Sequence, residues 1–202
     1  MPFFAPLPEP EPVVESGPSF FSVPGQRPQH WVPGAGPSGG VLARSDSTVV
    51  LLGVTGSYPQ GLELEVRVLV HPEHTDIDDS PRRRHRPEPL SGLRLGIQWA
   101  DGRRVEAEHM YGRARDLASD DFHLAMAGGG GGGLEWRWNA WLWPLPPAEP
   151  VDVYVEWSTR GIPETRTTFD LTPAVGWAEQ AFELWPLPGP PEDTGWFSYR
   201  QI

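Results

Sequence analysis

The sequence predicts an all-β fold: an antiparallel β-sandwich, immunoglobulin-like or fibronectin-like in general plan, with one short C-terminal helix and disordered arms. Three observations predict it. Apolar and polar residues alternate with a period of two in several short segments, turn residues separate these segments, and proline and glycine are concentrated in the N-terminal segment. Seven or eight short strands with turns between them are typical of two packed antiparallel sheets. The chain has no cysteine, so the disulfide of antibody domains is absent and the strand order stays open.

The first 47 residues are expected to form a disordered arm. They contain ten prolines and six glycines, which is above the share of about 25–30% that marks low-complexity segments. Phenylalanine pairs at 3–4 and 20–21 interrupt this arm, and they either dock to a partner or fold back onto the domain. The sequence therefore divides into an arm (1–47), a sandwich domain with its helix (48–186) and a proline-rich tail (187–202).

The strands are expected in the segments with clean alternation or an apolar run between turns. In chain order they are 48–56, 62–70, 93–99, 103–108, 122–127, 134–143, 151–157 and 165–171. The inward side chains follow from the alternation: Leu62, Leu64, Val66, Val68 and Val70 in one strand, Leu93, Leu95, Ile97 and Trp99 in another, and Val151, Val153, Val155 and Trp157 in a third. The turn "ADG" predicts that the strands 93–99 and 103–108 form a hairpin.

Residues 173–185 are expected to form an amphipathic helix that packs on the sandwich. Thr172 can cap it, Pro173 suits the first helical position, and Pro186 ends it. Apolar side chains then recur at helical spacing, at Trp177, Ala178, Ala181, Phe182 and Trp185.

The segment "GGGGGGLEWRWNAWLWPLPP" (128–147) is the least ordinary part of the chain. On a strand, Leu134, Trp136, Trp138, Ala140 and Leu142 share one face, which is expected to be core, and Trp141 and Trp143 lie on the other. Two exposed tryptophans would form a patch near the upper limit for a soluble monomer, so the patch is either covered by the helix or an arm, or used for binding. Trp141, Trp143, Trp177 and Trp185 are the candidate binding residues. The glycine run is expected to be a flexible linker or loop tip; no "GK[ST]" follows it, which rejects a phosphate loop.

The glycine run together with "WLWPLPP", "GIPET" and the upstream "LRLGIQWADGRR" resembles a group of actinobacterial proteins to which no activity is assigned. The resemblance covers most of residues 48 to 186. It implies a bacterial protein with one domain and gives no functional residues.

One polar segment contains side chains that could bind a metal ion or take part in catalysis. His71, His74, Asp76, Asp78 and Asp79 offer nitrogen and oxygen ligands within a short stretch, but "HExxH" is absent and four arginines follow between residues 82 and 86. A solvated insertion, a docking loop and a metal or catalytic site remain as interpretations, in that order. No nucleophile motif is present and no cofactor is expected.

The net charge of −11, with all 16 basic residues arginine, disfavours nucleic acid as a partner. The sequence has neither a signal peptide nor an apolar run of the ~20 residues that a membrane helix needs, so a cytoplasmic protein with no membrane contact is expected. The preferred hypothesis is a non-enzymatic protein-interaction or assembly module with a protein partner. The alternatives are a carbohydrate-binding module with an aromatic platform and a metal-dependent enzyme that uses the 71–79 cluster.

Overall fold

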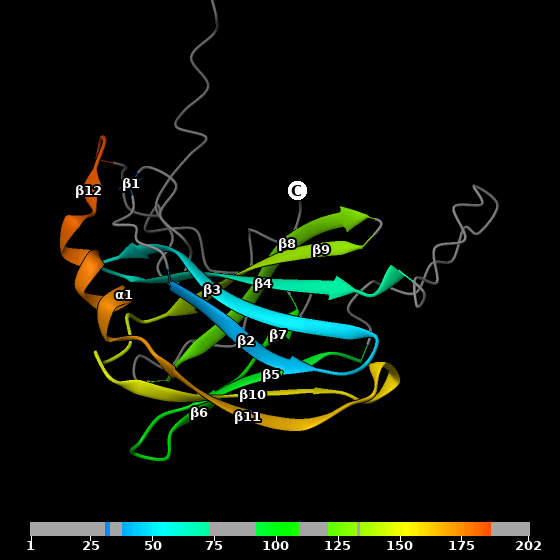
Figure 1. Ribbon diagram of the computed structural model, residues 1–202. Helices are drawn as coiled ribbons and strands as arrows, with labels where there is room; N and C mark the ends of the chain where they lie inside the picture. Colours follow the sequence, from blue (N-terminus) through cyan, green and yellow to red (C-terminus); the bar gives the residue numbers. More distant parts are fainter. Residues whose placement is uncertain (1–30, 33–37, 73–91, 110–120, 133, 187–202) are drawn as a thin grey trace, which may run out of the picture. The chain divides into compact units, whose positions relative to one another are not determined.

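Alternating side chains in the long strands build two packed sheets, as the sequence predicts. The structure is a computed structural model that describes residues 31–32, 38–72, 92–109, 121–132 and 134–186. The described residues fall within one structural unit. In it, a six-stranded sheet packs against a four-stranded sheet, and one short helix lies at one end (Figure 1). The predicted all-β sandwich is confirmed.

The six-stranded sheet has the order β2-β3-β4-β9-β8-β7. Its strands are β2 (Ser38–Arg44), β3 (Thr48–Tyr58), β4 (Gly61–Val70), β9 (Glu135–Trp143), β8 (His123–Gly132) and β7 (Glu108–His109). All neighbours are antiparallel except β7 and β8, which are parallel. The central strands β3 and β4 pair over nearly their full length, and β4 then pairs with β9.

The four-stranded sheet has the order β11-β10-β5-β6 and is antiparallel throughout. Its strands are β11 (Ile162–Asp170), β10 (Pro150–Trp157), β5 (Arg94–Gln98) and β6 (Arg104–Glu106). The predicted hairpin between β5 and β6 is confirmed: Gly102 has a φ of 89°, and its N–H donates to the carbonyl of Trp99. Gly161 likewise takes a left-handed φ of 68° at the turn between β10 and β11.

The core lies between the two sheets and consists of the side chains that the alternation assigned to it. The inward residues of β4, β5 and β10 are buried, and Leu93 is partly buried against them. Burial of such side chains is worth roughly 1.5–3 kcal/mol each and is the main source of stability in a fold of this kind. Trp99 extends this core at the far end of β5, where its ring stacks on Phe122 with a centroid distance of 3.8 Å.

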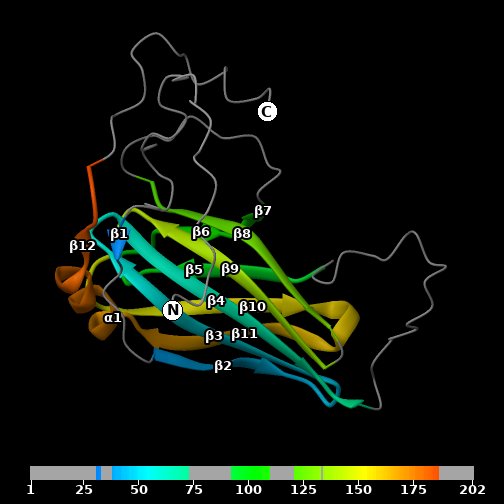
Figure 2. The same cartoon turned by 90° about the horizontal axis from the view of Figure 1, so that it is seen from above.

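Strands β2 and β11 close one side of the sandwich. The hydroxyl of Thr167 on β11 donates a hydrogen bond to the carbonyl of Leu42 on β2, with an O···O distance of 2.8 Å. At the end of the same side, the hydroxyl of Ser45 donates to the carbonyl of Arg160, also at 2.8 Å. These bonds join the edges of the two sheets, which lie side by side in Figure 2.

Two predicted boundaries differ from the structure. The sheet begins with β2 and not at residue 48, because Leu42 and Ala43 are buried and β2 pairs with β3 over the whole strand. A two-stranded ribbon of β1 (Trp31–Val32) and β12 (Phe182–Glu183) also uses part of the predicted arm. The remaining arm residues, the tail 187–202 and residues 73–91 lie outside the described residues.

The predicted helix over 173–185 is too long. The α-helix α1 covers Thr172–Trp177, a 3-10 turn follows at Ala178–Gln180, and the chain then becomes extended at Ala181. Pairing of Phe182 with Val32 in the ribbon competes with continuation of the helix. The helix does pack on the sandwich, because Ala174 is buried in the core.

Candidate functional site

Strand β9 carries the tryptophans and has the two faces that its sequence predicts. Ala140 and Leu142 are buried in the core, and Trp136 and Trp138 pack against it while remaining half-buried. The two indole rings are nearly parallel, with centroids 6.0 Å apart. Leu134 is the exception to the predicted inner face: it lies in the turn before β9, is 44% exposed, and its carbonyl accepts a hydrogen bond from the N–H of Val70.

The glycine run is a strand and not a linker, which corrects the expectation from sequence. Gly128–Gly132 lies in the second half of β8; Gly128 belongs to a bulge between Met126 and Gly129, and Gly129–Gly132 pairs with the first half of β9. Gly129 lies opposite Trp138 and Gly131 lies opposite Trp136. Gly130, between them, lies opposite Arg137 on the outer face. The hairpin that joins β8 to β9 lies at the end of the sandwich opposite α1 (Figure 1).

The reason for glycine at these positions is steric. A Cβ atom at Gly129 would lie 2.6 Å from Cγ of Trp138, and one at Gly131 would lie 2.6 Å from Cα of Trp136. Both distances are shorter than real Cβ contacts, so any side chain there would displace the tryptophan strand. At Gly130 nothing lies within 4 Å of the corresponding position. Glycine is therefore required opposite Trp136 and Trp138, and the sequence signal that shows this is the run of glycines directly before "WRW".

Among the described residues, the outer edge of β8 has no neighbouring strand along the glycines. Strand β7 pairs only with Ala125 and Met126, and beyond them no described strand pairs with the side of β8 that faces away from β9. Gly128, Gly129, Gly130 and Gly131 are exposed. An edge strand presents N–H and C=O groups that a further strand can pair with, and natural proteins usually block such edges with charged side chains, proline or a covering element. The glycines provide no side chain that would do so.

Trp141, the first candidate binding residue, is covered. It lies on the outer face of β9, yet it is only 5% exposed. Its ring contacts the edge of Tyr58, with centroids 5.5 Å apart and planes at 73°, and it lies over Gly61, where a Cβ would be 2.8 Å from Cζ2 of the indole. Its Nε1 is buried and has no hydrogen-bond partner. The sequence left open whether the outer tryptophans are covered or used for binding, and Trp141 is covered.

The other three candidate tryptophans have different environments. Trp143 shares the outer face with Trp141, is half-buried, and lies beside His123 with ring centroids 5.6 Å apart. Trp177, in α1, is half-buried and packs against the core. Trp185 is 57% exposed. A role of any of the four in binding stays a prediction.

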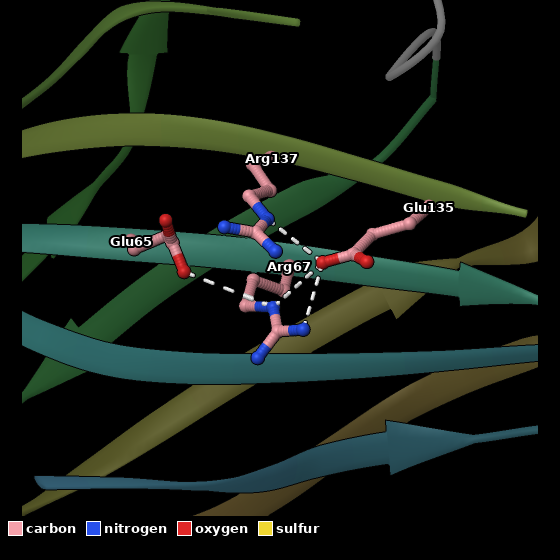
Figure 3. Close-up of polar contacts among 4 residues, drawn as sticks. All are labelled: Glu65, Arg67, Glu135 and Arg137. Atoms are coloured by element: carbon pink, nitrogen blue, oxygen red, sulfur yellow. Dashed lines mark hydrogen bonds and ion pairs between the residues drawn. The ribbon is translucent and has the colours of Figure 1, made fainter. Parts of the chain in front are cut away.

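A charged cluster occupies the outer face of the six-stranded sheet beside the glycine edge (Figure 3). Arg67 on β4 and Arg137 on β9 are direct cross-strand neighbours, and their like charges would repel if nothing lay between them. Glu135 bridges them: its Oε1 accepts from Nη2 of Arg67 and from Nε of Arg137, both at 2.7 Å. Nε of Arg67 also lies 3.8 Å from Oε1 of Glu65.

The pKa of Glu135 is held below its ordinary value, first by the hydrogen bond from Arg137 and then by that from Arg67. Because the carboxylate is solvent-accessible, the ion pairs stabilise the fold only modestly. Their main effect is to fix three side chains over the outer face and to neutralise the charge next to the glycine edge.

The predicted metal or catalytic cluster at 71–79 lies almost entirely outside the described residues. Of the predicted 71–79 cluster only His71 and Pro72 are described, and the rest lies outside. Among the described residues no three His, Asp or Glu side chains are placed to hold a metal ion. Within the same residues no helix is long and apolar enough to cross a membrane.

Comparison with protein-family models, with curated proteins and with solved structures gave no match to this chain.

Proposed function

We propose that this protein is a non-enzymatic interaction module that takes up an extended peptide as an additional strand on the glycine edge of β8. The observation that carries the proposal is the pairing of Gly129–Gly132: these residues pair with β9 on one side, and beyond β7 no described strand lies on the other. Strand addition of this kind obtains affinity from main-chain hydrogen bonds and specificity from contacts with alternate side chains.

The length of the edge suits a short peptide. At about 3.4 Å per residue, the four paired glycines offer roughly 14 Å of backbone, which is enough for four residues of a partner strand. No side chain on this half of β8 stands in the way of the incoming backbone. Ordering a glycine strand is entropically costly, because glycine loses more backbone freedom than any other residue. The tryptophan rings that pack across Gly129 and Gly131 hold the strand extended and supply that order.

The two faces of the edge predict the side chains of the partner. On the inner face, the half-buried rings of Trp136 and Trp138 lie one strand away, so alternate residues of the peptide are expected to be apolar. Aromatic or proline side chains are suited to contact indole rings. On the outer face, Arg137 is already paired with Glu135, so the peptide needs no acidic residue there.

Charge favours a foreign partner over a second copy of this chain. The net charge of −11 makes two copies repel each other at long range, whereas a basic peptide is attracted and a neutral one is not repelled. The occupant that we propose is therefore an extended segment of a neutral or basic partner protein with apolar residues at alternate positions. Pairing of two copies through their β8 edges is the competing outcome of the test below.

A selection from a phage library of random 12-residue peptides tests the proposal with the full chain as bait. We expect enrichment of peptides with apolar residues at alternate positions, bound by the native protein and by the variant Gly130→Ala. The variant Gly130→Pro should lose this binding, because Gly130 lies opposite Arg137 with its N–H directed at β9, and proline therefore breaks the pairing that holds the glycine strand in place for a partner.

Circular dichroism and the melting temperature establish that both variants keep the sandwich. Failure to enrich any peptide, or equal binding by the folded proline and alanine variants, would overturn the proposal. Sedimentation of the protein alone as a dimer that Gly130→Pro dissociates would assign the edge to a second copy instead.

A further inference from the structure

A second recognition surface lies on the outer face of the four-stranded sheet, away from the core. There the structure has a shallow, open hollow of about 610 Å³. Strands β5, β6 and β10 supply most of its wall. The polar side chains from these strands are Arg94, Gln98, Arg104, Glu106, Tyr154 and Glu156.

The hollow exists because a glycine sits at its centre. In the register of the sheet, Gly96 on β5 lies between Tyr154 on β10 and Glu106 on β6. Any other residue at this position would project its side chain outward between these two, whereas glycine leaves the backbone bare as a floor. A Cβ at Gly96 would lie 3.3 Å from the carbonyl oxygen of Val105, which is close but demands only a small shift.

One wall of the hollow is a fixed set of donors and acceptors. Nε of Arg94 lies 3.0 Å from Oε1 of Glu106, and its Nη1 lies 2.8 Å from Oε2 of Glu156. The guanidinium thus holds one carboxylate on each side, and both keep further lone pairs that face solvent. Gln98, on the same face of β5, adds an amide with both donor and acceptor capacity.

The charges of the hollow exclude most classes of ligand. Three carboxylates (Glu106, Glu156 and Glu164) line it against two guanidinium groups, one of which already pairs with two of these carboxylates, so an anion is disfavoured. Arg94 lies between two of the carboxylates and repels a metal ion. A purely apolar ligand would leave these polar groups without partners, which is costly.

We propose that the hollow binds a neutral, polyhydroxylated ligand, a saccharide, with its hydroxyl groups on Arg94, Gln98 and the two flanking carboxylates and its ring against Tyr154. Hydroxyl groups both donate and accept, which matches a wall that offers both. The aromatic side chain gives the apolar C–H face of a sugar ring a surface to pack on. The site is separate from the glycine edge, which belongs to the other sheet, and it does not use the candidate tryptophans.

The test is a screen of the full chain on an array of neutral oligosaccharides of glucose, galactose, mannose, xylose and N-acetylglucosamine, followed by calorimetric titration of those that bind. The site variants are Tyr154→Ala and Gln98→Ala. The matched control is Thr168→Ala, an exposed position on β11 outside the hollow. The melting temperature of each variant shows that it is folded.

We expect at least one oligosaccharide to bind, with an affinity that falls tenfold or more in both site variants and stays unchanged in the control. No binding by any member of the array overturns the proposal. Binding that survives both site variants, or that is lost in the control, also overturns it, because the ligand then sits elsewhere. If peptides from the phage selection compete with the oligosaccharide for the surface of Tyr154, the hollow is a peptide site and the saccharide proposal fails.

Discussion

Gly129→Ala and Gly130→Ala make the same chemical change at adjacent residues, but the structure predicts opposite effects on the free energy of unfolding. At Gly129 the new methyl group would lie 2.6 Å from Cγ of Trp138, and relieving this overlap means moving a strand that packs on the core. Overpacking of this kind costs about 1–3 kcal/mol of the free energy of unfolding. Because the clash involves the tryptophan strand itself and not the end of a flexible side chain, we expect the upper half of that range.

Gly130 is the matched control. Nothing lies within 4 Å of the position of its Cβ, and its φ is not positive, so alanine fits without strain. Alanine also restricts the unfolded chain, which stabilises the fold by about 0.4–1 kcal/mol where the native conformation is compatible. The two variants should therefore differ by roughly 2–4 kcal/mol, with the native protein between them.

Urea denaturation followed by circular dichroism and tryptophan fluorescence measures the free energies of unfolding. For a domain of this size, each kcal/mol corresponds to a change of about 2–4 °C in the melting temperature. If the glycines were a flexible linker, alanine would be tolerated equally at both positions. Equal stability of the two variants would therefore refute the pairing of β8 with the tryptophan strand and, with it, the open edge.

Three further predictions concern single interactions. Glu135→Gln removes the ion pair with Arg137. Since the folded-state pKa of Glu135 is depressed, the ion pair should stabilise the native protein above the ordinary pKa of 4.5, and this stabilisation should disappear as the pH falls through the folded-state pKa. Urea denaturation of the native protein and the variant across pH measures the difference, which should also shrink in 1 M salt. Thr167→Val should cost about 1 kcal/mol, because the carbonyl of Leu42 loses its donor, and a thermal melt that leaves the variant unchanged would show that this bond does not close the sandwich. Trp141→Phe removes a buried N–H that has no hydrogen-bond partner, so it should lower the free energy of unfolding by less than the 3–5 kcal/mol typical of Trp→Ala. A larger loss in urea denaturation would contradict the finding that this N–H is unpaired.

The parts of the fold that the sequence predicted correctly are those in which local pattern and burial agree. In β4 and β10 every second residue is apolar, and a sheet buried on one face turns that pattern directly into inward and outward side chains. The hairpin of β5 and β6 follows from a local turn. These features can be predicted without knowing which strands become neighbours.

The candidate site depends on contacts between strands, which the alternation within a single segment does not contain. Glycine has little preference for strands, and Gly128–Gly132 becomes one only because β9 lies beside it and its indoles need the space. Trp141 is covered in part by Tyr58, 83 positions earlier in the chain, so its burial could not be predicted from its own strand. The hollow over Gly96 arises in the same way, from residues on three strands.

Helix α1 shows the same limit. The spacing of Trp177, Ala181 and Trp185 is helical, yet the chain turns extended at Ala181 and pairs with β1. Local periodicity predicted the start of the helix and could not predict the competing strand that ends it.

Amide hydrogen exchange of Gly128–Gly132, with and without a peptide from the phage selection, tests the proposed strand addition most directly. We expect alternate amides of these glycines to exchange rapidly in the free protein, because they point away from β9, and to become protected when the peptide binds. We also expect little change in β10 and β11. If the peptide protects other segments and leaves the glycine amides unchanged, the open edge of β8 is not the binding site and the proposed function is wrong.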